Sequence, residues 1–90
     1  MHTIYSLTYN NMTYVGQTNN VYKRMSVHKT RSKTHTNRLY TAMRQHGFDK
    51  FKFHVLAMCE SKHDANMIEK TFIHKLGTLN MQHRPNGYAY

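Results

Sequence analysis

The stretch TYVGQTNNVYKRMSVH, from Thr13 to His28, joins a strand-like segment, a glycine and a basic helical segment. Arg24 and His28 are four residues apart, so a helix would present both side chains on one face. Gly16 would let the backbone pass close to another group. A guanidinium, an imidazole and a closely approaching backbone are suited to holding a phosphate group. The stretch therefore predicts a phosphate site.

Two side chains far from this stretch in sequence are candidates to complete the site. Tyr5 lies in HTIYSL, whose β-branched and aromatic residues are typical of a strand. If this strand pairs with the one that holds Tyr14, the two phenols would lie near each other. Glu69 lies in a segment with helical periodicity, IEKTFIHKL. We expect these positions to converge with Arg24 and His28.

Charge points to the partner of this site. The 90 residues include 13 Lys and Arg against 4 Asp and Glu, a formal net charge of +9, with 8 His in addition. Such an excess favours a polyanion such as DNA, RNA or an anionic membrane. For so short a chain we rank a nucleic-acid partner above a merely soluble basic protein. The length predicts one domain over residues 1–90.

Cysteine content and hydropathy bear on the compartment. The single cysteine, Cys59, has no partner for an internal disulfide and lies in an apolar run, which favours buried packing in a reducing compartment. No leader or membrane-spanning apolar run is visible, so we expect no membrane association. These features predict an intracellular location, in the cytoplasm or with the nucleoid, and leave a phage origin open. The scattered histidines match no structural zinc pattern.

Hydrophobic periodicity predicts an α+β fold in the order β-β-α-α-β-α, with a small three-stranded antiparallel sheet flanked by helices. The expected elements are strands over 1–7 and 12–17, a helix that begins after Asn19 or Asn20, a helix over 37–46, a strand over 51–58 and a helix from Ser61 to about Leu76. Because 51–58 becomes continuously apolar, we expect it to be the central strand. The residues expected to be buried on the last two helices are Leu39, Ala42, Met43, Ala65, Ile68, Phe72, Ile73 and Leu76.

At this point the chain resembles a known family, the GIY-YIG nucleases. The motifs TIY, ending at Tyr5, and YVG, beginning at Tyr14, are nine residues apart and are similar to the two motifs that name the family. Arg24 and His28 follow in the first helix, LYTAMRQHGFDKFKFHVL is similar to the middle segment of the family, and Glu69 lies in the last helix. The resemblance extends over nearly the whole chain.

Two positions depart from the pattern of the family. Thr3 stands where the family usually has glycine, and the closing GYN motif appears as Gly87, Tyr88 and Ala89, without its asparagine. Asn80 or Asn86 are candidates to replace that asparagine. The departure motivates a second hypothesis, a catalytically impaired domain of this family that binds nucleic acid without cutting it.

The resemblance implies hydrolysis of a phosphodiester bond with the help of one divalent metal ion. Mg²⁺ is the expected ion, with Mn²⁺ as an alternative, because Mg²⁺ keeps most of its water shell and needs few carboxylates. Glu69 is the expected metal ligand; the alternative is an ordinary helix glutamate paired with Lys62 or Lys70. Tyr5 would be the general base, with its pKa lowered by the metal and nearby cations. Tyr14 would orient the water or share the proton.

The basic residues have distinct expected roles. Arg24 would clamp the scissile phosphate, because its fork binds two phosphate oxygens. His28 would donate to the phosphate or pass a proton, and a histidine that merely covers the core is an equal alternative. Gln17 would hydrogen-bond the substrate. The residues expected to track the nucleic-acid backbone are Lys23, Lys29, Arg31, Lys33, Arg38 and Arg44.

The leading hypothesis is therefore a metal-dependent endonuclease, either free-standing or the catalytic part of a homing or repair enzyme. DNA is favoured over RNA as the substrate, and one site would act as a monomer or a transient dimer on DNA. Besides the impaired binding domain, charge alone would allow a small RNA-binding or ribosome-associated protein.

Overall fold

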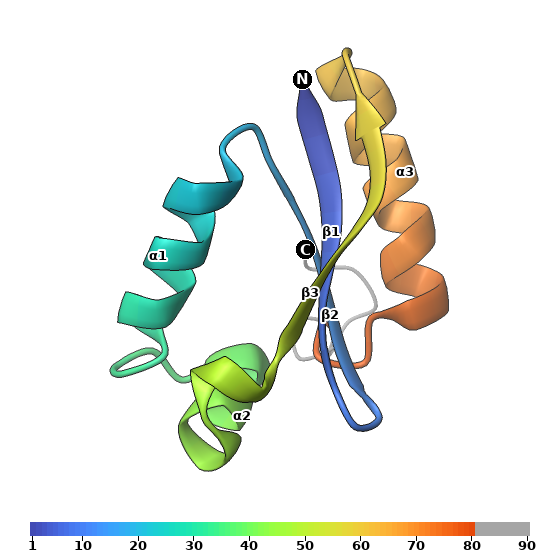
Figure 1. Ribbon diagram of the computed structural model, residues 1–90. Coiled ribbons are helices and arrows are strands. Elements are labelled where there is room, and N and C mark those ends of the chain that lie inside the picture. The colour runs from blue at the N-terminus through green and yellow to red at the C-terminus, as the bar shows by residue number, and fades with distance from the viewer. Residues whose placement is uncertain (81–90) are drawn as a thin grey trace.

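Three strands and three helices make up the part of the chain that the computed structural model describes, residues 1–80 (Figure 1). The elements are β1 (His2–Tyr9), β2 (Met12–Thr18), α1 (Val21–Arg31), α2 (Arg38–His46), a 3-10 turn (Phe48–Lys50), β3 (Lys52–Cys59) and α3 (Lys62–Leu76). The predicted element order and the α+β fold with a three-stranded antiparallel sheet are confirmed.

The sheet has the order β2-β1-β3, so β1 is its central strand. The prediction that the segment 51–58 forms the central strand is wrong, because β3 pairs with β1 alone within the described residues. Its apolar run does not reflect burial on both faces: Val55 is 53% exposed and Met58 is 61% exposed. The apolar run at 51–58 therefore lies on an edge strand with exposed apolar side chains.

Side chains of β1 alternate between two hydrophobic clusters, as the period of a strand requires. Tyr5 and Leu7 pack in a cluster with residues of α2, including Met43, whereas Ile4 packs in a cluster with Ala65 of α3. Figure 1 shows α3 along one side of the sheet, with α1 and α2 on the other side. The face that carries Tyr5 is therefore the face toward α1 and α2.

A β-bulge interrupts the pairing of β1 with β3 next to this tyrosine. Ile4 is opposite Ala57 and Tyr5 is opposite Val55, so Leu56 is the extra residue on β3. Such a bulge bends the strand and changes the direction of nearby side chains. The pairing of β1 with β2 is regular over its whole length and sets Tyr5 opposite Gly16.

The ends of the elements follow from residues that the sequence supplies. Asn10, at the turn of the β1–β2 hairpin, has φ 55°, a conformation that asparagine tolerates. The side chains of Asn20, Asn37 and Ser61 cap α1, α2 and α3 by accepting from backbone N–H groups three residues later. Gly47 ends α2 with φ 101°.

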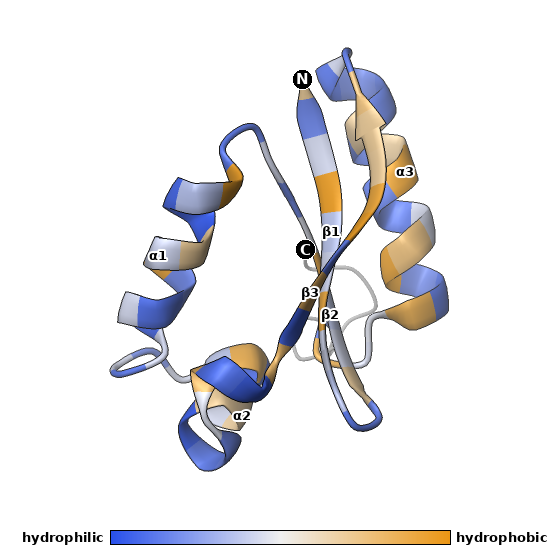
Figure 2. Cartoon of the chain, viewed as in Figure 1, coloured by the Kyte–Doolittle hydropathy of each residue, from blue (hydrophilic) through white to orange (hydrophobic). Residues whose placement is uncertain are grey.

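The predicted buried faces of the helices are largely confirmed. Figure 2 shows hydrophilic colours over most of α1, in contrast to the orange bands on β1 and α3. On α3, Ala65 and Ile73 are buried and Ile68 and Phe72 pack against them. Leu76 is the exception: it is 42% exposed, because α3 ends there and the chain turns away at Gly77. The remaining predicted residues, Leu39, Ala42, Met43 and Cys59, are buried.

Candidate active site

A chain of three hydrogen-bonded side chains lies between the sheet and the helices α1 and α2. The hydroxyl of Tyr5 is 2.7 Å from Nε2 of His28, and Nδ1 of His28 is 2.8 Å from the hydroxyl of Tyr40. Their exposed fractions are 0%, 1% and 5%. Tyr5 comes from β1, His28 from the last turn of α1 and Tyr40 from the first turn of α2. Tyr40 is not among the site residues predicted from the sequence, because no local sequence pattern links it to His28.

Tyr14 of β2 lies beside this chain. The centroid of its ring is 6.3 Å from that of Tyr5 and 5.6 Å from that of His28. Gly16 leaves the space that the two phenols fill: a Cβ atom there would lie 2.5 Å from Oη of Tyr5 and 2.9 Å from Tyr14. The glycine of YVG is thus required for close approach, as the sequence predicts.

Burial controls the protonation of the phenols. It raises the pKa of Tyr5 well above its ordinary value, and Tyr14, Tyr40 and Glu69 add to this effect while Arg24 opposes it. Burial likewise raises the pKa of Tyr14 to about 12. The predicted lowering of the pKa of Tyr5 by nearby cations is therefore wrong for the protein groups alone, because desolvation outweighs the guanidinium.

His28 is kept neutral by the same burial. Desolvation, followed by the charges of Arg24 and Arg31, lowers the pKa of His28 to about 4. At neutral pH one ring nitrogen therefore carries a proton and the other accepts a hydrogen bond. His28 is a buried core residue, as one of the two alternatives had it, and is also a direct hydrogen-bond partner of Tyr5.

Glu69 is on α3 and lies next to β2, within a network of polar side chains that join the two elements. Nε2 of Gln17 donates to Oε1 of Glu69 at 2.8 Å and to Oδ1 of Asn66 at 3.0 Å. Nζ of Lys62 donates to Oε1 of Gln17 at 2.9 Å. Burial raises the pKa of Glu69, whereas the hydrogen bond from Gln17 and the charges of Lys62 and Arg24 lower it. Gln17 therefore contacts the expected metal ligand directly.

Arg24 links the two sides of the site. After burial, which is the largest influence in each case, its guanidinium acts on the pKa of both phenols, of His28 and of Glu69. The carboxylate of Glu69 in turn raises the pKa of both phenols. Tyr5, Tyr14 and His28 are thus in contact with one another, whereas Arg24 and Glu69, from α1 and α3, act on the phenols through their charge.

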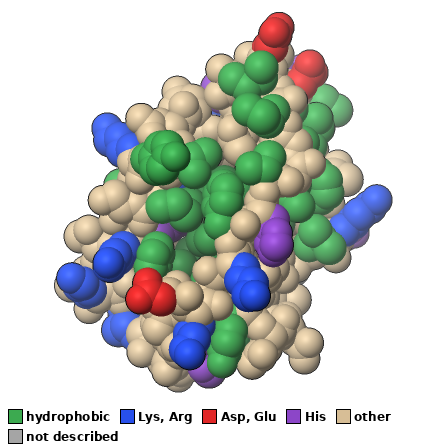
Figure 3. Space-filling model, in the orientation of Figure 1, with side chains coloured by type: hydrophobic (Ala, Val, Ile, Leu, Met, Phe, Trp, Pro, Cys, Tyr) green, Lys and Arg blue, Asp and Glu red, His purple; other side chains and the backbone are tan. Residues whose placement is uncertain are grey.

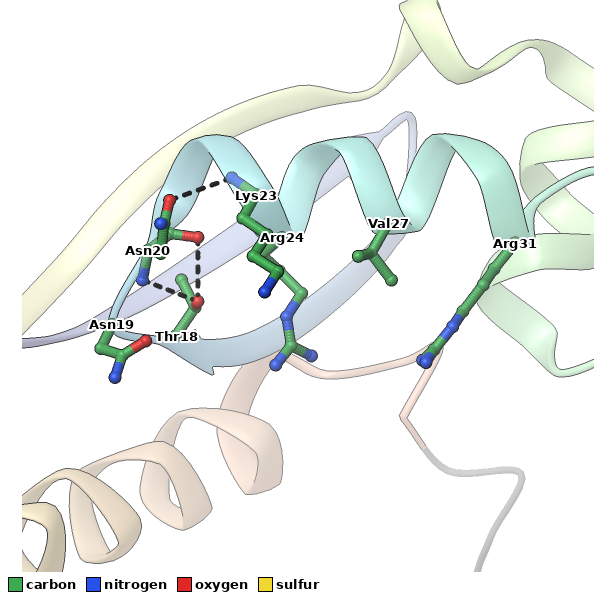
Figure 4. A pocket seen from close by; sticks show the side chains of 7 residues that line it. All are labelled: Thr18, Asn19, Asn20, Lys23, Arg24, Val27 and Arg31. Atoms are coloured by element: carbon green, nitrogen blue, oxygen red, sulfur yellow. Dashed lines mark hydrogen bonds between the residues drawn. The ribbon is translucent and has the colours of Figure 1, made fainter.

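A cavity of about 270 Å³ lies where β2 passes into α1 (Figure 4). Figure 4 shows the side chains of Arg24, Val27 and Arg31 extending from the same face of α1. The residues that line the cavity are Thr18, Asn19, Asn20, Lys23, Arg24, Val27 and Arg31. Three cations and three neutral polar residues around a space of this size suit a phosphate group.

The other predicted backbone-tracking residues lie outside this cavity. Arg44 donates to the carbonyl of Ser32, and Arg38 donates to the carbonyl of Thr78, so both hold the fold together. Lys29 and Lys33 are exposed. In Figure 3 the Lys and Arg side chains are scattered around a central group of hydrophobic side chains, and they form no continuous band on that face.

Asn80 has a structural use. It is buried, and its amide accepts from the backbone N–H of Val15 at 2.8 Å and donates to the carbonyl of Val15 at 3.0 Å. It thus ties the segment after α3 to β2. Asn86 and the motif Gly87–Ala89 lie outside the described residues.

Within residues 1–80, no group of three or more His, Cys, Asp or Glu side chains could hold a metal ion. None of the helices in that range is long and apolar enough to cross a membrane.

Comparison with known proteins identifies the family. No curated protein and no solved structure matches the chain. The sequence model of the GIY-YIG catalytic domain, in contrast, matches residues 1–84. This match extends over every strand and helix described above and includes Tyr5, Tyr14, Arg24, His28 and Glu69. The chain therefore belongs to the GIY-YIG family of nuclease domains.

Proposed function

We propose that the protein is a divalent-metal-dependent endonuclease that hydrolyses phosphodiester bonds of DNA, with residues 1–90 as one domain. The observation that carries the proposal is the contact of Tyr5, Tyr14 and His28 from three elements, together with the charges of Arg24 and Glu69, which act on both phenols. A phosphodiester gains negative charge in the transition state, so an enzyme needs cations fixed around it. The net charge of +9 and the cavity beside Arg24 support a polyanionic substrate.

Glu69 and Asn66 supply side-chain oxygen atoms, the ligands that Mg²⁺ and Mn²⁺ prefer together with several waters. Oε1 of Glu69 and Oδ1 of Asn66 both accept from Nε2 of Gln17, at 2.8 and 3.0 Å, so the amide of Gln17 would have to move for an ion to bind between them. We propose Glu69 as the metal ligand, with Asn66 beside it. A bound Mg²⁺ would polarise a phosphoryl oxygen and lower the pKa of its water.

Arg24 is proposed to bind the scissile phosphate. Its guanidinium lies at the wall of the cavity and acts electrostatically on the phenols and on Glu69. A fixed guanidinium fork binds two oxygens of one phosphate and offsets the charge that develops there. Lys23 and Arg31, on the same cavity wall, would bind neighbouring phosphates of the strand without reading its bases.

Tyr5 and His28 are proposed to remove the proton of the attacking water. A neutral phenol with a raised pKa is a poor base, so Tyr5 must release its own proton as it accepts another. His28 Nε2, 2.7 Å away, can receive that proton because the imidazole is neutral. The hydroxide then attacks phosphorus, the bond to the leaving sugar oxygen breaks, and that oxygen takes a proton from solvent water while His28 gives up the proton that it received. Tyr14, which is less buried than Tyr5, would orient the water at the mouth of the site.

A plasmid-nicking assay tests the proposal. The parent protein should nick supercoiled DNA with Mg²⁺ or Mn²⁺ and not with excess chelator. Glu69→Gln should abolish nicking and leave binding, measured by fluorescence anisotropy, within a few-fold. Glu60→Gln is the matched control, because Glu60 is an exposed carboxylate before α3. If Glu69→Gln nicks as fast as the parent, the metal assignment is wrong.

The second candidate, a binding domain without activity, is favoured by Ala89 alone. It predicts tight DNA binding with no metal-dependent nicking by the parent. In that case Ala89→Asn should restore cutting. The preference for DNA is tested in the anisotropy assay with a competitor RNA of the same length as the DNA: the RNA should displace the DNA less effectively than unlabelled DNA does. A nicking rate that is linear in protein concentration would support a monomer, and a steeper dependence would support a transient dimer.

A further inference from the structure

Tyr40 is the one member of the buried hydrogen-bonded chain that has no part in the function proposed above. We propose that Tyr40 is a positioning residue, whose hydroxyl holds His28 in the tautomer with a free Nε2 that can accept the proton of Tyr5. The inference rests on the proposed nuclease function and deepens it. It starts from two distances, 2.7 Å between Tyr5 Oη and His28 Nε2, and 2.8 Å between His28 Nδ1 and Tyr40 Oη.

A neutral imidazole allows two arrangements of this chain. In the first, Nδ1–H donates to Tyr40 and Nε2 accepts from Tyr5. In the second, Nε2–H donates to Tyr5 and Nδ1 accepts from Tyr40. Only the first leaves a lone pair on the nitrogen next to Tyr5, so only the first allows His28 to take a proton from that phenol.

Burial favours the first arrangement. A buried hydroxyl whose proton has no acceptor costs about 1–3 kcal/mol. Tyr5 is 0% exposed, and its hydroxyl lies 2.7 Å from Nε2 of His28 and also shares a side-chain hydrogen bond with Tyr14. Tyr40 retains some exposure, 5%, so its hydroxyl proton is closer to solvent. In the proposed arrangement the more buried phenol, Tyr5, donates to the imidazole, and the imidazole donates to Tyr40.

The position of Tyr40 is fixed independently of the helix that carries His28. Its backbone N–H donates to the capping side chain of Asn37 at 2.9 Å, and its neighbours Leu39 and Met43 are buried. Its ring is buried in the cluster that holds Tyr5 and Leu7. A rigidly held hydroxyl is what an orienting partner of a catalytic histidine requires.

The charged groups around His28 keep its ring neutral before the reaction. Arg24 and Arg31, on its own helix, disfavour a second proton on the imidazole, so they oppose the step in which it takes the proton of Tyr5; the phenols of Tyr5, Tyr14 and Tyr40 surround the rest of the ring. Burial and these two arginines lower the pKa of His28 to about 4. The ring therefore stays neutral at the pH of the reaction, and its tautomer is set by hydrogen bonding.

The test is Tyr40→Phe, which keeps the ring and removes the hydroxyl, in the full 90-residue chain. Long-range ¹H–¹⁵N NMR reports which nitrogen of His28 carries the proton. The parent should show Nδ1–H. In the variant Nδ1–H loses its acceptor, so the fraction of Nε2–H should rise, against the cost of removing the imidazole acceptor of the Tyr5 hydroxyl. In the nicking assay kcat should fall about 10-fold or more, within the contribution of general acid–base catalysis, with KM nearly unchanged.

Tyr9→Phe is the matched control, because Tyr9 packs against the same cluster without joining the hydrogen-bonded chain. It should leave both the tautomer and kcat unchanged. The proposal is overturned if the parent already shows Nε2–H, or if Tyr40→Phe leaves the tautomer of His28 as it was. If the parent cuts no DNA, the proposed function fails, and the NMR result still decides the role of Tyr40.

Discussion

Acidification should destabilise the fold through His28, by an amount that can be calculated. The imidazole is 1% exposed, and burial lowers its pKa from 6.5 to about 4. At a pH between these two pKa values, His28 is protonated in the unfolded chain but neutral in the folded chain. Stability is therefore full above pH 6.5 and is lost as the pH falls. The loss should be about 2 kcal/mol at pH 5 and about 3 kcal/mol below pH 4.

This loss is large for a domain of this size, whose total stability is expected to be about 5–13 kcal/mol. Urea unfolding at several pH values, followed by far-UV circular dichroism because the chain has no Trp, measures it. Other groups titrate in the same range; the raised pKa of Glu69, for example, acts in the opposite direction. The comparison must therefore be made against a variant.

His28→Gln is that variant, since glutamine can both donate and accept but does not titrate. It should be less stable than the parent at neutral pH and should lose about 3 kcal/mol less on acidification. His63→Gln, at an exposed position on α3, serves as the control and should behave like the parent. Parallel loss of stability in the parent and in His28→Gln would refute the reasoning.

Three further perturbations have definite expected outcomes. Gly16→Ala would put a Cβ atom 2.5 Å from the hydroxyl of Tyr5, so it should lower stability by about 1–3 kcal/mol and slow nicking; parent-like values of both would contradict this. Asn80→Ala leaves a buried amide of β2 without its acceptor and should cost about 1–3 kcal/mol in urea unfolding, whereas a neutral effect would mean that water replaces the side chain. Gln17→Ala removes a hydrogen bond that lowers the pKa of Glu69, so that pKa should rise in a metal-free NMR titration; a fall would contradict the network described here.

Much of the fold could be predicted because its signals are local. The nine-residue interval from Tyr5 to Tyr14, with a turn at Asn10, led directly to the β1–β2 hairpin, and the capping asparagines marked two helix starts. The place of β3 was mistaken because apolar composition does not distinguish a buried strand from an apolar edge. In this chain Val55 is apolar and exposed.

The contact of Tyr5, Tyr14 and His28 could be predicted from motif spacing, but its electrostatics could not. Sequence shows charge without burial, so the predicted lowering of the pKa of Tyr5 was wrong for the protein groups alone. Tyr40 and Asn66 were missed for a different reason. Their hydrogen bonds join side chains 12 and 49 residues apart, and no short pattern encodes such a contact.

The outer edge of β3 has a consequence for handling the protein. Within residues 1–80 no strand pairs with that edge, and it carries exposed Val55 and Met58. An apolar strand with free backbone groups is a template for self-association, which mutual repulsion between copies of charge +9 opposes. Added salt screens this repulsion and also lowers the affinity of the protein for a polyanion. The ionic strength that releases nucleic acid during purification should therefore also promote aggregation of the protein.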